Sequence, residues 1–326
     1  MAWLQYSLWR GVGHETSLKG MTMPQVVPVP ERTLDPNKKH LLIIAHQDDE
    51  VLYSGLLHRI NSRGNLYILW VTNGDGLAPE ENMPPNEYAA IREAESLKSA
   101  AVIGVPESRV AMLHYSEIKI YDMFVELAIP SGNRVLALEY FLEIATKVEE
   151  HIRELNPDSI WTDAYQGGHP EHDLTHLAAA RACRIIRREK QIELPLFELP
   201  EYEYTIFVSA RFRPWWKGQI HQIFLTDAES KVKEDVLKCY PSQEKLFAKF
   251  KRVFDRTGKL AKLFGKGFTA EDFVRKEVFA RVPDFRDYTA HPQFAEWATY
   301  MFDKHKNVKI RFDKCIRPIA EHLFKA

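Results

Sequence analysis

The chain has 326 residues, with 44 lysine and arginine residues against 45 aspartate and glutamate residues, and 45% of its residues are hydrophobic. These values are typical of a globular protein and exclude a disordered, collagen-like or coiled-coil chain. The formal net charge of −1 gives no global attraction to nucleic acid, so we expect no nucleic-acid partner.

Residues 1–39 show neither helical nor strand periodicity and become rich in proline towards their end, which predicts an N-terminal arm. No window of the chain approaches the roughly 18 consecutive apolar residues of a membrane-spanning helix, and we expect a cytoplasmic protein. The cysteines, Cys183, Cys239 and Cys315, form no Cys-x-x-Cys pair. A disulfide framework or a cysteine zinc site is therefore not expected.

From His40 onwards, apolar strand-like runs alternate with helical patterns. This alternation predicts strands at 40–46, 65–71, 109–116 and 159–163, and helices at 50–63, 86–105 and 134–155. Strands separated by helices of this length favour right-handed crossovers and a doubly wound, mostly parallel, Rossmann-like α/β sheet. In such sheets, ligands bind beyond the carboxyl ends of the strands.

Acidic residues crowd around a histidine after the first predicted strand, where residues 45–50 read AHQDDE. A helix N-terminus favours one or two acidic side chains by about 0.3–1 kcal/mol each. That effect accounts for Asp48 or Glu50 but not for the whole cluster, which indicates a bound cation.

A second cluster follows the fourth predicted strand, where residues 167–172 read GGHPEH. Loops after parallel strands meet at one edge of a sheet, so His46 and His172 can approach each other although 126 positions separate them. Two imidazoles, one carboxylate and an open position are what a catalytic zinc ion requires.

The two motifs resemble those of the PIG-L/LmbE-like family of zinc-dependent N-acetylglucosaminyl deacetylases, whose members carry AHPDDE after the first strand and HPDH in a later loop. The resemblance extends to TNGD at 72–75, to Arg92 and Glu95, and to LKCYPSQ at 237–243. It covers about residues 40–250, and motifs in this order are specific.

The resemblance implies the roles of the motif residues. His46, Asp49 and His172 are expected to bind zinc, and Asp48 is expected to act as the general base. His169 is expected to act as the general acid that protonates the leaving amine.

Three further positions carry expectations from the same resemblance. Glu171 takes the place of the aspartate that orients or raises the pKa of the general acid, here His169. Arg92 matches an arginine that contacts substrate hydroxyls or phosphate, with an ion pair to Glu95 as the alternative. Asn73 is assigned to substrate binding, although Asn-Gly-Asp-Gly is also typical of a tight turn.

The chain departs from the family pattern at two places in these motifs. Gln47 replaces the usual proline, which removes the ring constraint on the backbone. Glu171 replaces an aspartate, so its carboxylate sits one methylene further from the backbone. Neither change removes a catalytic group.

The function expected from the resemblance is zinc-dependent hydrolysis of the N-acetyl group of a GlcNAc-type amino-sugar conjugate. Alternatives are a zinc amidase acting on a non-sugar or thiol-conjugate amide, and a sugar-binding relative without catalysis. Two histidines and a carboxylate also match the iron triad of oxygenases. The alternation of strands and helices disfavours that triad, which is usually found on all-β frameworks.

We predict a catalytic domain at 40–250 and a helical C-terminal extension at 251–326. Residues 244–266 carry eight basic and two acidic residues, and the apolar residues of this stretch keep helical spacing. This stretch is interpreted either as an amphipathic helix docked on the domain or as a peripheral contact with an anionic membrane or a phosphorylated glycan carrier. The remaining extension could cover the site or form an oligomer contact.

Overall fold

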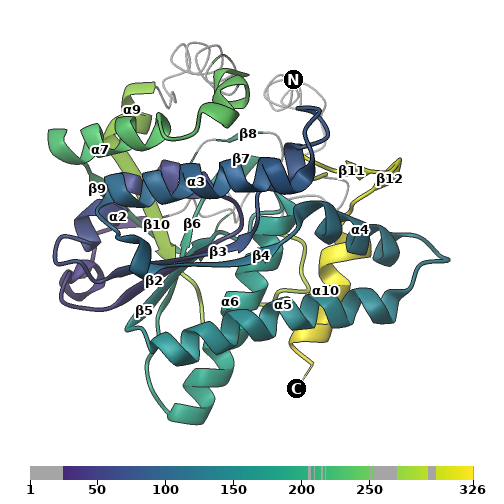
Figure 1. Ribbon diagram of the computed structural model, residues 1–326. Coiled ribbons are helices and arrows are strands. Elements are labelled where there is room, and N and C mark those ends of the chain that lie inside the picture. The colour runs from purple at the N-terminus through teal and green to yellow at the C-terminus, as the bar shows by residue number, and fades with distance from the viewer. Residues whose placement is uncertain are drawn as a thin grey trace, which may run out of the picture.

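The structure, a computed structural model, describes residues 25–204, 207–208, 210–213, 216, 218–249, 252, 270–292 and 299–325. These residues form an eight-stranded sheet with helices on both faces, shown in Figure 1. The doubly wound, mostly parallel α/β fold expected from the sequence is thereby confirmed.

Five neighbouring strands of the sheet are parallel and follow the spatial order β6-β5-β2-β3-β4. Their bounds are β2 His40–Ile44, β3 Leu66–Thr72, β4 Val110–Tyr115, β5 Ser159–Asp163 and β6 Leu196–Leu199. Four of the five were predicted, and β5 has the predicted bounds. β6 was not anticipated because its run between a helix and a proline is only four residues long.

Helices make the crossovers between these strands. They are a 3-10 turn η3 (Asp49–Tyr53) leading into α2 (Ser54–Ile60), α3 (Pro85–Ile103), α4 (Glu117–Ala128), α5 (Arg134–Leu155) and α6 (Pro170–Lys190). α5 has the predicted bounds, and α3 ends at Gly104 in the left-handed conformation that glycine adopts readily. α4 was not predicted from the sequence. It begins after Ser116, whose side chain accepts a hydrogen bond from the backbone N–H of Lys119.

The strand order reverses at β2. Ile43 pairs with Leu69 of β3 on one side and with Thr162 of β5 on the other. The chain first adds β3 and β4 on one side of β2 and then adds β5 and β6 on the opposite side. The loops after β2 and β5 therefore flank the crevice where doubly wound sheets bind ligands.

Side chains of β2 alternate between two cores. Leu41 and Ile43 pack towards α4, α5, α6 and α10 (Arg317–Leu323), whereas Leu42 and Ile44 pack towards α2, α3 and α7 (Asp227–Leu237). Figure 1 shows these two groups of helices on opposite faces of the sheet. A strand buried on both faces explains the uninterrupted apolar run Leu-Leu-Ile-Ile that follows His40.

The predicted helical extension at 251–326 also contains a strand, which lies in the part of the sheet beyond β6. β10 (Lys276–Arg281) lies within the sheet and pairs antiparallel with β6 and with β9 (Gln219–Phe224). β1 (Gln25–Val27), from the expected arm, pairs with β9. β10 pairs with the open edges of both β6 and β9, and this pairing makes a strand of a short run that the sequence analysis had assigned to a helical extension. The domain boundaries at 39 and 250 remain predictions.

Short elements complete the described chain. They are the 3-10 turns η2 (Glu31–Leu34), η4 (Asp75–Leu77), η5 (Glu107–Arg109) and η6 (Pro241–Gln243), the strand pairs β7 (Tyr202–Tyr204) with β8 (Phe207–Val208) and β11 (Lys304–His305) with β12 (Val308–Lys309), the helix α9 (Ala270–Arg275) and the π-helical turn η7 (Phe312–Ile316).

Most of the predicted basic helix at 244–266 lies outside the described residues, so its contact with a membrane or glycan carrier stays a prediction. Within the described ranges, no helix is both long enough and apolar enough to cross a bilayer.

Candidate metal centre and active site

Three predicted ligand side chains meet between the ends of β2 and β5. Nδ1 of His46 lies 3.0 Å from Nε2 of His172 and 3.4 Å from Oδ2 of Asp49. Oδ1 of Asp49 lies 3.3 Å from the same Nε2 of His172. His46 is 12% exposed at its side chain, and Asp49 and His172 are buried, so the three groups share a pocket with limited access to water.

These separations fit a tetrahedral metal ion. Bonds of about 2.0–2.1 Å to nitrogen and oxygen place the ligand atoms of tetrahedral zinc about 3.3 Å apart. The three observed separations lie between 3.0 and 3.4 Å, with Oδ2 of Asp49 facing His46 and Oδ1 of Asp49 facing His172. Buried atoms nearby also lack hydrogen-bond partners among the described residues, including Nδ1 of His169 and Oδ1 of Asp163. Orphaned buried polar atoms of this kind fit a site completed by an ion and its ligands.

The loop after β2 is held in place by backbone hydrogen bonds. The N–H of His46 donates to Oδ2 of Asp49 at 2.7 Å, and the N–H of Ala45 donates to Oδ2 of Asp163 at 2.9 Å. Gln47, at the position where the resembled motif has proline, is fully buried, and its side-chain amide donates to the carbonyl of Thr72 at 2.8 Å. A hydrogen bond to the neighbouring loop thus substitutes for the conformational constraint of a proline ring.

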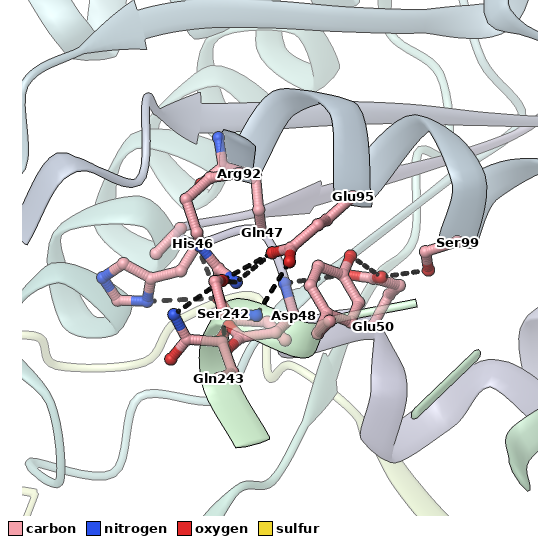
Figure 2. Close-up of polar contacts among 12 residues, drawn as sticks. His46, Gln47, Asp48, Glu50, Arg92, Glu95, Ser99, Ser242 and Gln243 are labelled. Carbon is pink, nitrogen blue, oxygen red and sulfur yellow. Dashed lines mark hydrogen bonds and ion pairs between the residues drawn. The ribbon is translucent and has the colours of Figure 1, made fainter. Parts of the chain in front are cut away.

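Asp48 has an unusual backbone conformation, with φ at 135°. Few residues other than glycine adopt such angles, and they persist where surrounding contacts enforce them. Three contacts surround Asp48: its N–H donates to Glu50 at 3.2 Å, its carbonyl accepts from Val51 at 3.0 Å, and its carboxylate lies 3.2 Å from Arg92. Glu50 is itself fixed, because it accepts hydrogen bonds from Ser99 and Tyr240 (Figure 2).

Arg92 is enclosed by protein groups. Its guanidinium lies 3.2 Å from Asp48 and 3.3 Å from Glu95, donates to Ser242 at 3.3 Å, and is stacked over Tyr240. Its side chain is 3% exposed. Figure 2 shows Arg92 and Glu95 facing Ser242 of the 237–243 motif. The expected ion pair with Glu95 is therefore present, and the guanidinium is committed to groups of the chain itself.

Glu171 lies closer to His46, a predicted metal ligand, than to His169, the predicted general acid. Its Oε2 accepts from Nε2 of His46 at 2.9 Å but lies 3.7 Å from Nδ1 of His169. From the sequence, Glu171 was predicted to contact His169. In the structure its shorter contact is the hydrogen bond with His46. Glutamate has one methylene more than aspartate, so the carboxylate of Glu171 reaches beyond His169 to the ring of His46. Histidine ligands of metals characteristically carry such a carboxylate on the second ring nitrogen.

Besides Asp163, two carboxylates at this centre were not anticipated from the sequence. Glu201, after β6, is buried and has Oε2 at 3.4 Å from Nδ1 of His172. Glu117, the first residue of α4, lies with Glu171 beside His46, and all three can offer ligand atoms within 4.8 Å of one another. Both residues follow the carboxyl end of a parallel strand, and this position was the available signal.

Asn73 lies in the loop after β3, and its hydrogen bonds stabilise that loop. Its side-chain oxygen accepts from the N–H of Asp75 at 3.1 Å, and its own N–H donates to Tyr115 at 2.9 Å. Asp75 in turn accepts from the Ser116 hydroxyl at 2.6 Å. The turn interpretation of this run accounts for these contacts, and substrate binding by Asn73 stays a prediction.

The buried charges shift several pKa values. Burial raises the pKa of Asp48 to about 8, with Arg92 acting in the opposite direction. Burial opposes ionisation of Asp49, but His172 and His46 outweigh it and lower the pKa of Asp49 well below its usual value. Burial and the nearby His46 and His172 lower the pKa of His169 well below its usual value. A centre with this excess of carboxylates attracts cations.

Comparison with solved structures supports the fold. The chain is similar to a deacetylase of the teicoplanin biosynthesis pathway, with 19% identity, a TM-score of 0.53, and coverage of 75% of this chain and 99% of that one. It is also similar to the A40926 pseudoaglycone deacetylase Dbv21, with 18% identity, a TM-score of 0.51, and coverage of 78% and 100%. Comparison with curated proteins gives no match.

The family comparison covers the strands and loops that carry both motifs. Residues 41–183 match the model of the PIG-L family, described as GlcNAc-PI de-N-acetylase. The matched segment runs from β2 into α6 and includes the AHQDDE loop and the HPEH loop. Over residues 41–183, which are 143 of its 326 residues, the chain is therefore similar to the PIG-L family.

Proposed function

We propose that the chain is a zinc-dependent N-deacetylase that removes the acetyl group from an N-acetylated amino sugar, in a GlcNAc-type conjugate. The observation that carries this proposal is the convergence of His46, Asp49 and His172 at separations suited to tetrahedral zinc. The PIG-L family match supports the reaction and the sugar class.

Zinc held by these residues would supply Lewis acidity, which activates a water and polarises an acetyl carbonyl. The chain's own groups handle the protons. Asp48 accepts the proton of the attacking water, and its raised pKa brings it close to the working pH of a general base. Arg92, 3.2 Å away, holds the Asp48 carboxylate in position.

His169 is proposed to donate a proton to the departing nitrogen. Its ring lies 4.6 Å from that of His46 and 4.9 Å from that of His172, measured between centroids, so it borders the ligand set. Its lowered pKa favours the neutral ring, so the donor role requires that the ring gains a proton during the reaction before the carbon–nitrogen bond breaks.

The proposal is tested by primary-amine release from free, nucleotide-linked, lipid-linked and oligomeric N-acetylhexosamines, each with a chelator control. Chelator-sensitive release from one class supports the function and names the substrate. No release from any member of the panel by zinc-loaded protein would contradict the sugar assignment and favour another amide.

The proposed division of roles is tested by two substitutions at adjacent carboxylates. Asp48→Asn should keep zinc and lose most turnover, whereas Asp49→Ala should lose zinc. Equal loss of zinc in both variants would contradict the assignment.

A further inference from the structure

Three consecutive residues from the C-terminal part of the chain are fixed around the candidate site. The hydroxyl of Tyr300 donates to Asp173 at 2.9 Å, and the N–H of Met301 donates to the carbonyl of Gly168 at 2.8 Å. The carbonyl of Phe302 accepts from the hydroxyl of Tyr121 at 3.1 Å. Two of these three bonds hold the loop and helix start that present His169.

The hairpin that follows adds further anchors. β11 and β12 turn through Lys306 and Asn307, which both adopt positive φ angles as tight hairpin turns require. His305 lies 2.7 Å and Lys306 2.6 Å from the carboxylate of Asp122 in α4. The backbone on both sides of Phe302 is therefore tied to elements that frame the site.

The Phe302 ring is placed beside His169 but remains accessible. The two ring centroids are 5.0 Å apart, and Phe302 is 37% exposed. A single exposed phenylalanine does not by itself indicate a binding site, and Phe285, which is 98% exposed, is an example. Phe302 differs because its backbone is fixed on both sides and its ring borders the proposed general acid.

We propose that Phe302 forms an aromatic wall of the substrate site and packs against the C–H face of the pyranose ring that carries the acetamido group. The inference rests on the proposed function. In an N-acetylhexosamine the acetamido nitrogen is bonded directly to a ring carbon. When His169 reaches that nitrogen, the sugar ring lies next to the Phe302 ring. Aromatic side chains supply apolar contact area at little entropic cost.

The test compares Phe302→Ala and Phe302→Tyr with the wild type, using the best amino-sugar substrate of the panel. Phe302→Ala should raise KM about tenfold and leave kcat within about twofold, because the stacking contact forms on binding. Phe302→Tyr keeps the ring and should restore the KM. Phe285→Ala, an exposed phenylalanine elsewhere, is the matched control and should change neither constant.

Saturation-transfer NMR with N-acetylglucosamine separates this inference from the proposed function. Phe302→Ala should lose most of the transfer to the ring protons, and Phe302→Tyr should keep it, whether or not the wild type releases amine. Equal transfer to all variants would overturn the inference. So would a fall in kcat at unchanged KM in Phe302→Ala, because the ring would then only support His169. A wild type that binds the sugar but releases no amine would overturn the proposed function alone.

Discussion

Oε2 of Glu171 lies 2.9 Å from Nε2 of His46, and Nδ1 of the same imidazole faces His172 and Asp49. The imidazole of His46 thus lies between a supporting carboxylate on one nitrogen and the ligand set on the other. This arrangement fixes the ring orientation and increases the basicity of the ligating nitrogen.

Glu171→Gln should therefore weaken zinc binding by about 10- to 100-fold, because the amide is a poorer acceptor for the His46 ring N–H. Competition with a chromophoric chelator measures the zinc affinity. Glu171→Asp is the second variant to compare. It introduces the aspartate of the resembled motif and moves the carboxylate back by one methylene. An unchanged zinc affinity together with lost turnover would return Glu171 to the role of partner of His169.

The backbone strain at Asp48 predicts a difference between two inactive variants. At φ of 135°, glycine is accommodated more readily than alanine. Asp48→Gly should therefore have a larger free energy of unfolding than Asp48→Ala, by about 1 kcal/mol, as measured by urea denaturation. Equal stability of the two variants would mean that this backbone angle costs nothing. Neither variant should show turnover, because both lack the proposed base.

Arg92→Lys tests whether the guanidinium positions Asp48 or binds substrate. A lysine cannot bridge Asp48 and Glu95 as the planar guanidinium does, so Asp48 should lose its fixed orientation. We expect kcat to fall about 10- to 100-fold with little change in KM. A KM increase confined to phosphate-bearing substrates would instead support the substrate contact expected from the sequence.

The ion pair of Glu229 with Arg59 should stabilise the folded protein at neutral pH and lose this effect in acid. Burial raises its pKa, but hydrogen bonds from Arg59 and from the N–H of Thr226 outweigh this and lower the pKa from 4.5 to about 2. Because the folded-state pKa is the lower one, the stabilisation is complete above pH 4.5 and is lost as the pH falls towards 2. The Tm difference between the wild type and Glu229→Gln should be largest above pH 5 and should shrink on acidification. A difference independent of pH would assign the effect to packing.

The parallel part of the fold was predictable because its signals are local. β5 and α5 have the bounds that the apolar run and the helical spacing indicated. β10 was assigned to a helical extension because its six residues fit either periodicity. The open edges of β6 and β9 decide that choice, and they come from distant parts of the chain.

The candidate site divides in the same way. The resemblance of the two motifs to those of the PIG-L/LmbE-like family implied His46, Asp49 and His172 as a ligand set, and their positions after strand ends favoured one shared site. The motifs did not indicate that Glu171 supports His46, that Glu201 faces His172, or that Phe302 lies beside His169. The sequence by itself determined which chemical groups the parallel strands carry to one edge. Only the tertiary structure decided which groups face each other there, because contacts at 3–5 Å depend on side-chain directions, and two of these three contacts join residues over 100 positions apart.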